Sequence, residues 1–406
     1  MVTPRSTSPD SRSGANLLAE SGQPTFFAVD QPERLDLARP ERDGRHRVRV
    51  WARSLSGMQK EAIVGSSYPT HPGTLWRVAS DEGPYLDGFD AAPCPLAFMT
   101  VGMVSSYMNA LYAAARRRAF DLRDVVLVQD NRYTMEGSAL QGTMTGGALP
   151  VALEVRIGSG VDEDVLRDLV AEAIEASPVH GLQRESHTSR FTLTVNGEGI
   201  SLDRAVPLLG PVAQDPGPLF AHVHPATNGD GGHVARLEAV TPVSGVAGGV
   251  GSSLRAEQRR ELHVRAECRQ RLTGVNEIRQ ELHSPLGSTF TMLSHDGAAP
   301  YDSGLAPDAA SYMAAGVAFC FMTQLGRFAT IMKRALTGYR VVQDTYYAMG
   351  EQGRPGAVGA VETHVFLDTP DGADFARQCL DMGEQTCFLH ALYRTSLKPG
   401  VTITRV

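Results

Sequence analysis

The 406-residue sequence contains one long pattern twice. Residues 93–120, PCPLAFMTVGMVSSYMNALYAAARRRAF, align without a gap with residues 307–334, PDAASYMAAGVAFCFMTQLGRFATIMKR. Shorter matches accompany this pair of segments: Leu55-Ser-Gly57 with Leu272-Thr-Gly274, Pro84-Tyr85 with Pro300-Tyr301, and Val128-Gln-Asp130 with Val342-Gln-Asp344. A repeat of this length is too long for a solenoid, so the sequence indicates a duplicated domain.

Each copy follows the same predicted plan of elements. Extended, alternating segments come first, as in RVRVWARSLSGMQ and VRAECRQRLTG, and they predict antiparallel strands. A long helix follows at 93–120 and 307–336, with a proline near its first turn, where a missing N–H is not needed. A strand pair, an amphipathic helix and a final strand complete each copy. We therefore expect an α+β fold in which each copy is an antiparallel sheet with a long central helix.

The two copies set the expected domain boundaries. Domain 1 covers residues 46–198 and domain 2 covers residues 260–406. Between them, residues 199–259 are rich in Gly and Pro, as in PLLGPVAQDPGPLF and VSGVAGGVGSS, which is typical of a long linker or an ordered excursion. Residues 1–45 are expected to form a flexible N-terminal tail.

Composition argues against several classes of protein. The formal net charge is −7 at pH 7 and no block of Lys or Arg stands out, so we expect neither nucleic acid nor a membrane as partner. We expect no transmembrane helix, because no charge-free stretch of about 18 apolar residues is apparent. The N-terminal MVTPRSTSPDSRSG is polar and unlike a signal peptide. Five scattered cysteines do not resemble a secreted disulfide framework, so a cytoplasmic location is expected.

Two cysteines distinguish the copies. Cys320 lies in the long helix of copy two, and its counterpart in copy one is Ser106. Cys387 opens CFLHALYR, and its counterpart Ser177 opens SPVHGLQR. The paired replacement indicates one function that copy one has lost. A thiolate that attacks a peroxide becomes a sulfenic acid, which a second thiol converts to a disulfide. Serine performs neither step, because its hydroxyl stays protonated near neutral pH.

The remaining candidate groups have plainer explanations. Three cysteines fit buried packing positions: Cys94, Cys268 and Cys379. His390 lies one helical turn from Cys387, but His180 persists in copy one where the thiol is gone, which favours a structural role. Three linker histidines lack a Cys or carboxylate frame, so we expect no metal site there: His222, His224 and His233.

Together these motifs resemble the OsmC/Ohr family, named for osmotically inducible protein C and organic hydroperoxide resistance protein. That family has a central helix reading roughly AAxxACF and a CPVxxxL motif near the C-terminus. Here the first reads Ala314-Ala-Gly-Val-Ala-Phe-Cys320-Phe321 and the second reads Cys387-Phe-Leu-His390-Ala-Leu392. Phe388 replaces the proline of the second motif, whereas SPVHGL in copy one keeps the proline and loses the thiol. The resemblance covers both copies.

The resemblance implies two tandem OsmC-like domains that form an intramolecular pseudo-dimer, since the family is normally an intertwined dimer, or that pair between chains as a homodimer. It implies a thiol-dependent reduction of organic hydroperoxides, with Cys320 as the peroxidatic thiolate and Cys387 as the resolving thiol. The family holds its thiolate with an Arg from an early strand and an acidic residue at the start of the central helix. The matching candidates are Arg279, with Arg271 second, and Asp308, which lies two residues further from Cys320 than the family's acidic residue.

The implied partners are a dithiol reductant and a hydrophobic small-molecule substrate, and neither an organic cofactor nor a metal is implied. An apolar substrate fits the helix around Cys320, which includes Phe319, Phe321 and Met322. Two alternatives remain. The chain could be a specialised pathway enzyme that uses Cys320 on another electrophile or on a sulfur-containing metabolite. It could also be a small-molecule-binding or redox-sensing protein.

Overall fold

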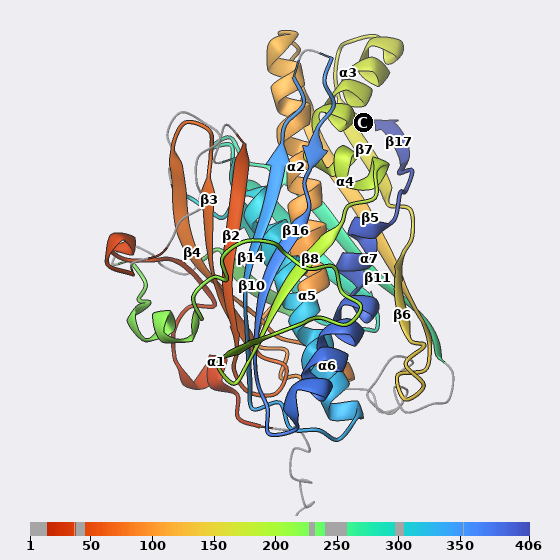
Figure 1. Ribbon diagram of the computed structural model, residues 1–406. Coiled ribbons are helices and arrows are strands. Elements are labelled where there is room, and N and C mark those ends of the chain that lie inside the picture. Colours follow the sequence, from red (N-terminus) through yellow and green to blue (C-terminus); the bar gives the residue numbers. More distant parts are fainter. Residues whose placement is uncertain are drawn as a thin grey trace, which may run out of the picture.

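The computed structural model describes residues 14–35, 37, 45–226, 232–239, 258–296, 304–351 and 353–406. Over these residues the chain is α+β, with two mixed β-sheets around a pair of long helices (Figure 1). The first copy supplies, in order, β2 (His46–Ser54), β3 (Lys60–Ser67), β4 (Pro72–Ser80), α2 (Pro95–Arg117), β5 (Arg123–Gly137), β6 (Thr145–Ala148), β7 (Ala152–Gly158), α3 (Glu163–Ala176), α4 (Pro178–Arg184) and β8 (Ser189–Val195).

The second copy repeats this order of elements. It supplies β11 (Gln258–Gln270), β12 (Asn276–Ser284), β13 (Thr289–Ser294), α5 (Ala309–Ile331), β14 (Gly338–Ala348), β15 (Ala357–Val358), β16 (Val361–Asp368), α6 (Gly372–Thr386), α7 (Phe388–Arg394) and β17 (Gly400–Arg405). Short elements outside the two copies are α1 (Leu17–Glu20), β1 (Phe26–Ala28), β9 (Glu198–Ile200), β10 (Val234–Glu238) and a 3₁₀ helix at Gly217–His222.

Each sheet combines the early strands of one copy with the late strands of the other. One sheet has the strand order β1-β4-β3-β2-β14-β16-β8-β9, and the other has the order β10-β13-β12-β11-β5-β7-β17. The copies meet in antiparallel pairs, β2 with β14 and β11 with β5. Two parallel pairs, β16 with β8 and β17 with β7, make both sheets mixed. The two halves are therefore interlocked, and residues of one copy lie beside the central helix of the other.

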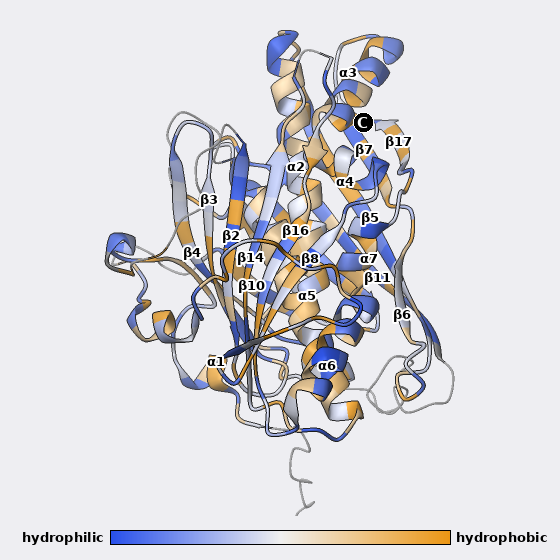
Figure 2. Ribbon diagram, viewed as in Figure 1, coloured by the Kyte–Doolittle hydropathy of each residue, from blue (hydrophilic) through white to orange (hydrophobic). Residues whose placement is uncertain are grey.

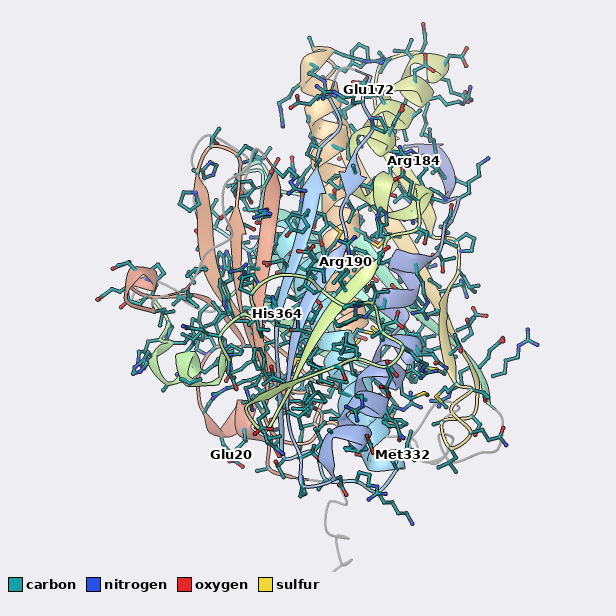
Figure 3. All side chains as sticks on the ribbon, in the orientation of Figure 1. Glu20, Glu172, Arg184, Arg190, Met332 and His364 are labelled. Atoms are coloured by element: carbon teal, nitrogen blue, oxygen red, sulfur yellow. The ribbon has the colours of Figure 1, made fainter. Side chains whose placement is uncertain are left out.

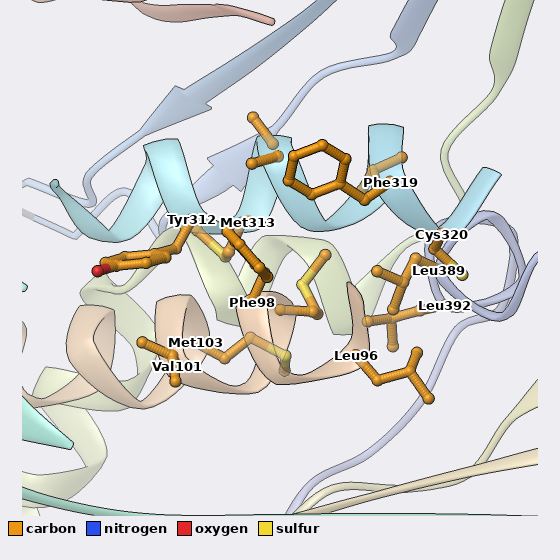
Figure 4. Close-up of a cluster of buried hydrophobic side chains, with 14 of the residues drawn as sticks. Leu96, Phe98, Val101, Met103, Tyr312, Met313, Phe319, Cys320, Leu389 and Leu392 are labelled. Atoms are coloured by element: carbon orange, nitrogen blue, oxygen red, sulfur yellow. The ribbon is translucent and has the colours of Figure 1, made fainter. Parts of the chain in front are cut away.

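The two long helices lie between the sheets and pack against each other in an antiparallel pair. α5 contacts β2, β3 and β14, while α2 contacts β5, β11 and β12. Close contact between the helices depends on two glycines. A Cβ on Gly102 would lie 2.6 Å from the Ala309 carbonyl oxygen, and a Cβ on Gly316 would lie 3.0 Å from the Met99 nitrogen. Figure 2 shows how apolar both helices are, and Figure 4 shows their packed side chains.

One helix departs from an expectation drawn from the sequence. By length and composition α5 is able to cross a membrane, contrary to the expectation that no such stretch exists. Most of its apolar stretch is buried between the sheets, which accounts for its composition. The charged side chains labelled in Figure 3, among them Glu172, Arg184 and Arg190, are instead partly exposed at the outside of the fold.

Parts of the expected tail and linker belong to the sheets. Phe26 and Phe27 are fully buried, and β1 pairs with β4 at the edge of its sheet. β10 pairs with β13 at the matching edge of the other sheet. The described residues 14–35 are thus not a flexible tail, because their aromatic pair is part of the core. Both edge strands lie outside the expected domains at 46–198 and 260–406.

Candidate active site

The fold brings Cys320 and Cys387 together. Cys320 lies in the middle of α5, and Cys387 forms the junction between α6 and α7, where its extended backbone makes it the N-cap of α7. Both side chains are buried, with 2% and 0% of their surface exposed, and both are reduced. The two thiols interact by a side-chain hydrogen bond. Figure 4 shows Cys320 beside Leu389 of α7 at one end of the helix pair.

The surroundings of the two sulfurs favour negative charge on Cys387. Burial raises the pKa of Cys320, and the hydrogen bond to Cys387 raises it further. Burial opposes ionisation of Cys387 as well, but the hydrogen bond from Cys320 and the neighbouring His390 bring the pKa of Cys387 well below its usual value. The backbone N–H of His390 donates to the Cys387 sulfur at 3.5 Å, as expected at a helix N-terminus. These neighbours therefore favour a thiolate on Cys387 over a thiolate on Cys320.

The side chain of His390 is enclosed by aromatic rings. Its ring lies 5.6 Å from Phe191 and 5.3 Å from Phe321, measured between centroids. Both ring nitrogens of His390 are buried. The His390 ring thus packs between Cys387 and these two aromatic rings, and any positive charge on it favours the thiolate of Cys387.

The serine pair of copy one has the same arrangement. Ser106 lies in α2 as Cys320 lies in α5, and Ser177 is the N-cap of α4 as Cys387 is the N-cap of α7. The Ser106 and Ser177 hydroxyl oxygens lie 2.8 Å apart in a buried hydrogen bond. Duplication has preserved the position of the pair and changed the atom that carries out the chemistry.

Copy one supplies a buried lysine whose charge interacts with Cys320. Lys60 begins β3 and is fully buried. Burial lowers the pKa of Lys60, while the carboxylates of Glu82 and Asp81 and the thiolate form of Cys320 act to raise it. A positive charge near a sulfur favours the thiolate over the thiol. Lys60 is therefore a buried cation able to favour a thiolate at Cys320.

The Glu82 carboxylate of copy one is hydrogen-bonded to α5, the helix that carries Cys320. One oxygen of its carboxylate accepts a hydrogen bond from the Thr323 hydroxyl at 3.0 Å, and the other accepts from the Tyr85 hydroxyl at 2.6 Å. Thr323 lies one turn after Cys320 on α5. This contact fixes the carboxylate beside the thiol and ties copy one to copy two.

A small cavity leads to Cys320. Its volume is about 40 Å³, which is enough for little more than a water molecule before side chains move. Leucine, proline and phenylalanine side chains form most of its wall: Leu86, Pro95, Leu96, Leu262, Leu282, Pro285 and Phe388. Two arginines also line it, and burial lowers the pKa of Arg327 to about 9 and of Arg260 to about 10. The cavity is thus apolar with a cationic side.

The other residues named from the sequence lie elsewhere. Arg279 is on an outward-facing position of β12, where it donates to Glu281 at 2.8 Å, and Arg271 donates to Glu277 at 3.0 Å. Asp308 is the N-cap of α5 and lies beside Ser106 rather than Cys320. The twelve residues from Asp308 to Cys320 span about 18 Å of helix. The structure brings together the two thiols but neither the arginines nor Asp308.

The sequence contains one signal that would have identified Lys60. The chain has only three lysines against a large number of arginines, and Lys60 is the one placed inside an apolar strand pattern. The exchange of strands between the two copies explains why Lys60, and not Arg279, lies on the side of α5. β11 and β12 belong to the sheet that packs on α2, so Arg279 lies away from α5, whereas β3 of copy one packs on α5 and begins with Lys60.

No metal site accompanies these thiols among the described residues. Within those ranges no group of three or more His, Cys, Asp or Glu side chains is arranged to hold an ion. The chemistry that the site does support is a proton transfer between two thiols followed by disulfide formation.

Comparison with known proteins adds little to this geometry. No family model matches the sequence, and no curated protein matches it. Among solved structures there is a match to an OsmC-like hydroperoxide resistance protein from Jannaschia sp. CCS1. It is 22% identical, covers 30% of this chain and 79% of that one, and superposes with a TM-score of 0.19.

Proposed function

We propose that this chain is a thiol-dependent peroxidase that reduces hydrophobic organic hydroperoxides. The observation that carries the proposal is the hydrogen-bonded pair of Cys320 and Cys387 at the end of an apolar cavity, with a buried cation nearby. The first copy keeps the same geometry with two serines, which supports a reaction that depends on sulfur.

The reaction needs no group besides the two thiols and their neighbours. Cys320 passes its proton to the Cys387 thiolate, and its sulfur then attacks one oxygen of the hydroperoxide. The O–O bond breaks, the substrate leaves as an alcohol after taking up a proton, and Cys320 becomes a sulfenic acid. Cys387 then loses its proton and attacks the Cys320 sulfur, which expels water and forms the disulfide. An external dithiol then reduces the disulfide and returns both cysteines to the thiol state.

The proposal extends to the architecture and the setting. Two OsmC-like halves would form the pseudo-dimer within one chain, with one reactive and one unreactive site, and two chains could still associate. A dithiol reductant requires a reducing compartment, so we place the protein in the cytoplasm. The apolar wall of the cavity favours an apolar substrate over hydrogen peroxide.

The test is intact-mass analysis of the reduced protein after one equivalent of cumene hydroperoxide, with peptide mapping of any new disulfide. We expect a bridge between Cys320 and Cys387 that is absent in Cys320→Ser. In Cys387→Ser, dimedone should label Cys320, because the sulfenic acid has no resolving partner. The control is Cys379→Ser, since Cys379 is buried and burial raises the pKa of its thiol to about 12.

An unchanged mass, or a bridge between other cysteines, would contradict the peroxidase proposal. A Cys320 that reacts with iodoacetamide but not with any hydroperoxide would indicate an enzyme that acts on another electrophile or on a sulfur-containing metabolite. A disulfide that forms but that no dithiol reduces would indicate a redox sensor.

A further inference from the structure

The cavities beside the cysteine pair and the serine pair differ strongly in volume. The cavity at Cys320 has a volume of about 40 Å³, whereas the cavity at Ser106 has a volume of about 540 Å³. The larger volume is in the range of cavities that hold small organic ligands. Its wall includes side chains from both copies: Tyr68, Ser106, Asp296, Asp308, Met313 and Tyr347. The half without thiols has therefore kept a larger chamber than the half with them.

The serine half lacks the buried cation of the cysteine half. Lys60 pairs with Ser80 across β3 and β4, and the residue in the same register, paired with Ser294, is Asn276. Asn276 is fully buried and donates to Asn109, which lines the chamber, at 2.8 Å. A neutral amide thus occupies the position of the Lys60 ammonium.

The chamber beside Ser106 nevertheless has carboxylates in its wall. Asp296 follows Ser294 by two residues, as Glu82 follows Ser80, and it lines the chamber. Asp308 is fixed by three donors: the Ser311 N–H at 2.7 Å, the Ser66 hydroxyl at 2.7 Å and the Tyr68 hydroxyl at 2.6 Å. Its equivalent at the N-cap of α2 is the uncharged Cys94. The duplicated site has lost a buried cation and gained a carboxylate.

His46 does not supply the missing positive charge. Its ring stacks on Tyr68 with 4.2 Å between centroids, and it lines the chamber. Burial lowers the pKa of His46, although Asp308 and Asp296 act in the opposite direction. Its Nε2 atom is buried and, in the described part of the chain, has no hydrogen-bond partner. The rim carries exposed charges of both signs: Arg45, Glu351 and Arg354.

We propose that the chamber beside Ser106 binds a small organic ammonium ion with an apolar or aromatic body. The ammonium group would lie near Asp308 and Asp296, in the electrostatic role that Lys60 has in the other half. The ring of Tyr347 attracts an organic cation, and Met313 offers apolar contact to its body. His46 Nε2 accepts a hydrogen bond from the ammonium. This binding requires no thiol and is independent of the peroxidase proposal.

The test uses three probes of one shape and different charge: benzylamine, which is a cation at pH 7, benzyl alcohol and benzoate. Isothermal titration of the full chain should give an affinity for benzylamine about tenfold or more above that for benzyl alcohol, and no binding of benzoate. Asp308→Asn keeps an N-cap side chain and should remove most of that preference. Asp162→Asn is the matched control, since Asp162 is also a helix N-cap and does not line the chamber.

A second variant locates the bound probe. Met313→Trp should fill the chamber and abolish benzylamine binding, and circular dichroism and the unfolding midpoint report whether the variant is folded. If the helix pair does not accept Trp, Tyr68→Phe offers a smaller change that removes a competing donor from Asp308 and should strengthen benzylamine binding. Benzoate binding as tightly as benzylamine, or the absence of benzylamine binding to folded wild-type protein, would overturn the proposal. So would an affinity that Asp308→Asn leaves unchanged.

Discussion

The hydroxyl oxygens of Ser106 and Ser177 lie 2.8 Å apart, in the relation that the thiols of Cys320 and Cys387 have in the other half. Both pairs join a central helix to the N-cap of the following short helix. The backbone that holds a dithiol is therefore present twice, and only one copy has sulfur at these two positions.

This relation predicts that a second disulfide can be built. In a background of Cys320→Ser and Cys387→Ser, the double variant Ser106→Cys and Ser177→Cys should form an intramolecular disulfide with diamide, because the side chains already touch. Peptide mapping by mass spectrometry checks it. Its oxidation by cumene hydroperoxide should be slower than that of wild-type protein by about tenfold or more, since Asn276 stands where Lys60 favours the thiolate. Equal rates would show that Lys60 has no part in activating the thiol.

Lys60 itself allows a direct test. Lys60→Met removes the buried ammonium and keeps a long apolar side chain, so the thiolate form of Cys320 loses a positive charge that interacts with it. The rate of alkylation of Cys320 by iodoacetamide should fall by about tenfold at pH 7. Lys398→Met is the control, because Lys398 is exposed. An unchanged alkylation rate in a folded Lys60→Met protein would contradict the role given to Lys60.

The fold was largely predictable from the duplication. The order of elements, the two long helices and the α+β class follow from repeated periodicity, and α2 and α5 lie within the expected ranges. The early strands β1 and β10 were not predictable. Each is short, lies in a segment rich in turn-forming residues, and is stabilised by pairing with β4 or β13 from a distant part of the chain.

The site was predictable only in part, for a related reason. Cys320 and Cys387 differ visibly from their serine counterparts, so comparison of the copies identifies them. The family resemblance points to Arg279 because this residue lies on an early strand of the same copy as the thiols. Strand exchange sends that strand to the other sheet, which is a property of tertiary structure that spacing within one copy does not contain. Lys60 reaches the site through the same exchange.

Asp81 makes a measurable contribution to the pH dependence of stability. Burial raises the pKa of Asp81 to about 6, although hydrogen bonds from the Ala91 and Glu82 N–H groups and the charge of Lys60 act to lower it. The folded protein therefore binds this proton more tightly than the unfolded chain, whose value lies near 4. The resulting stabilisation is complete below about pH 4 and is lost as the pH rises through about 6.

The variant Asp81→Asn should remove this dependence. The difference in unfolding free energy between wild type and Asp81→Asn should shift by about 2 to 3 kcal/mol between pH 4 and pH 7, with wild type relatively more stable at pH 4. Urea unfolding at a series of pH values measures it. A difference that does not change with pH would mean that Asp81 titrates at the same pH in the folded and unfolded protein.

Gly102 determines how closely the two central helices approach. A Cβ at this position would lie 2.6 Å from the Ala309 carbonyl oxygen and 2.9 Å from the Met313 nitrogen, and backbone atoms cannot rotate away as a side chain can. Gly102→Ala should therefore destabilise the protein by about 1 to 3 kcal/mol, even though alanine is the better helix former. Gly160→Ala is the control, since a Cβ there meets nothing within 4 Å. Guanidinium unfolding compares the two.

The same substitution should also affect the chamber beside Ser106, because Ala309 and Met313 both line it. A displacement of α5 in Gly102→Ala should therefore alter benzylamine binding. If Gly102→Ala is destabilised but binds benzylamine as wild type does, then helix packing does not determine the shape of the chamber.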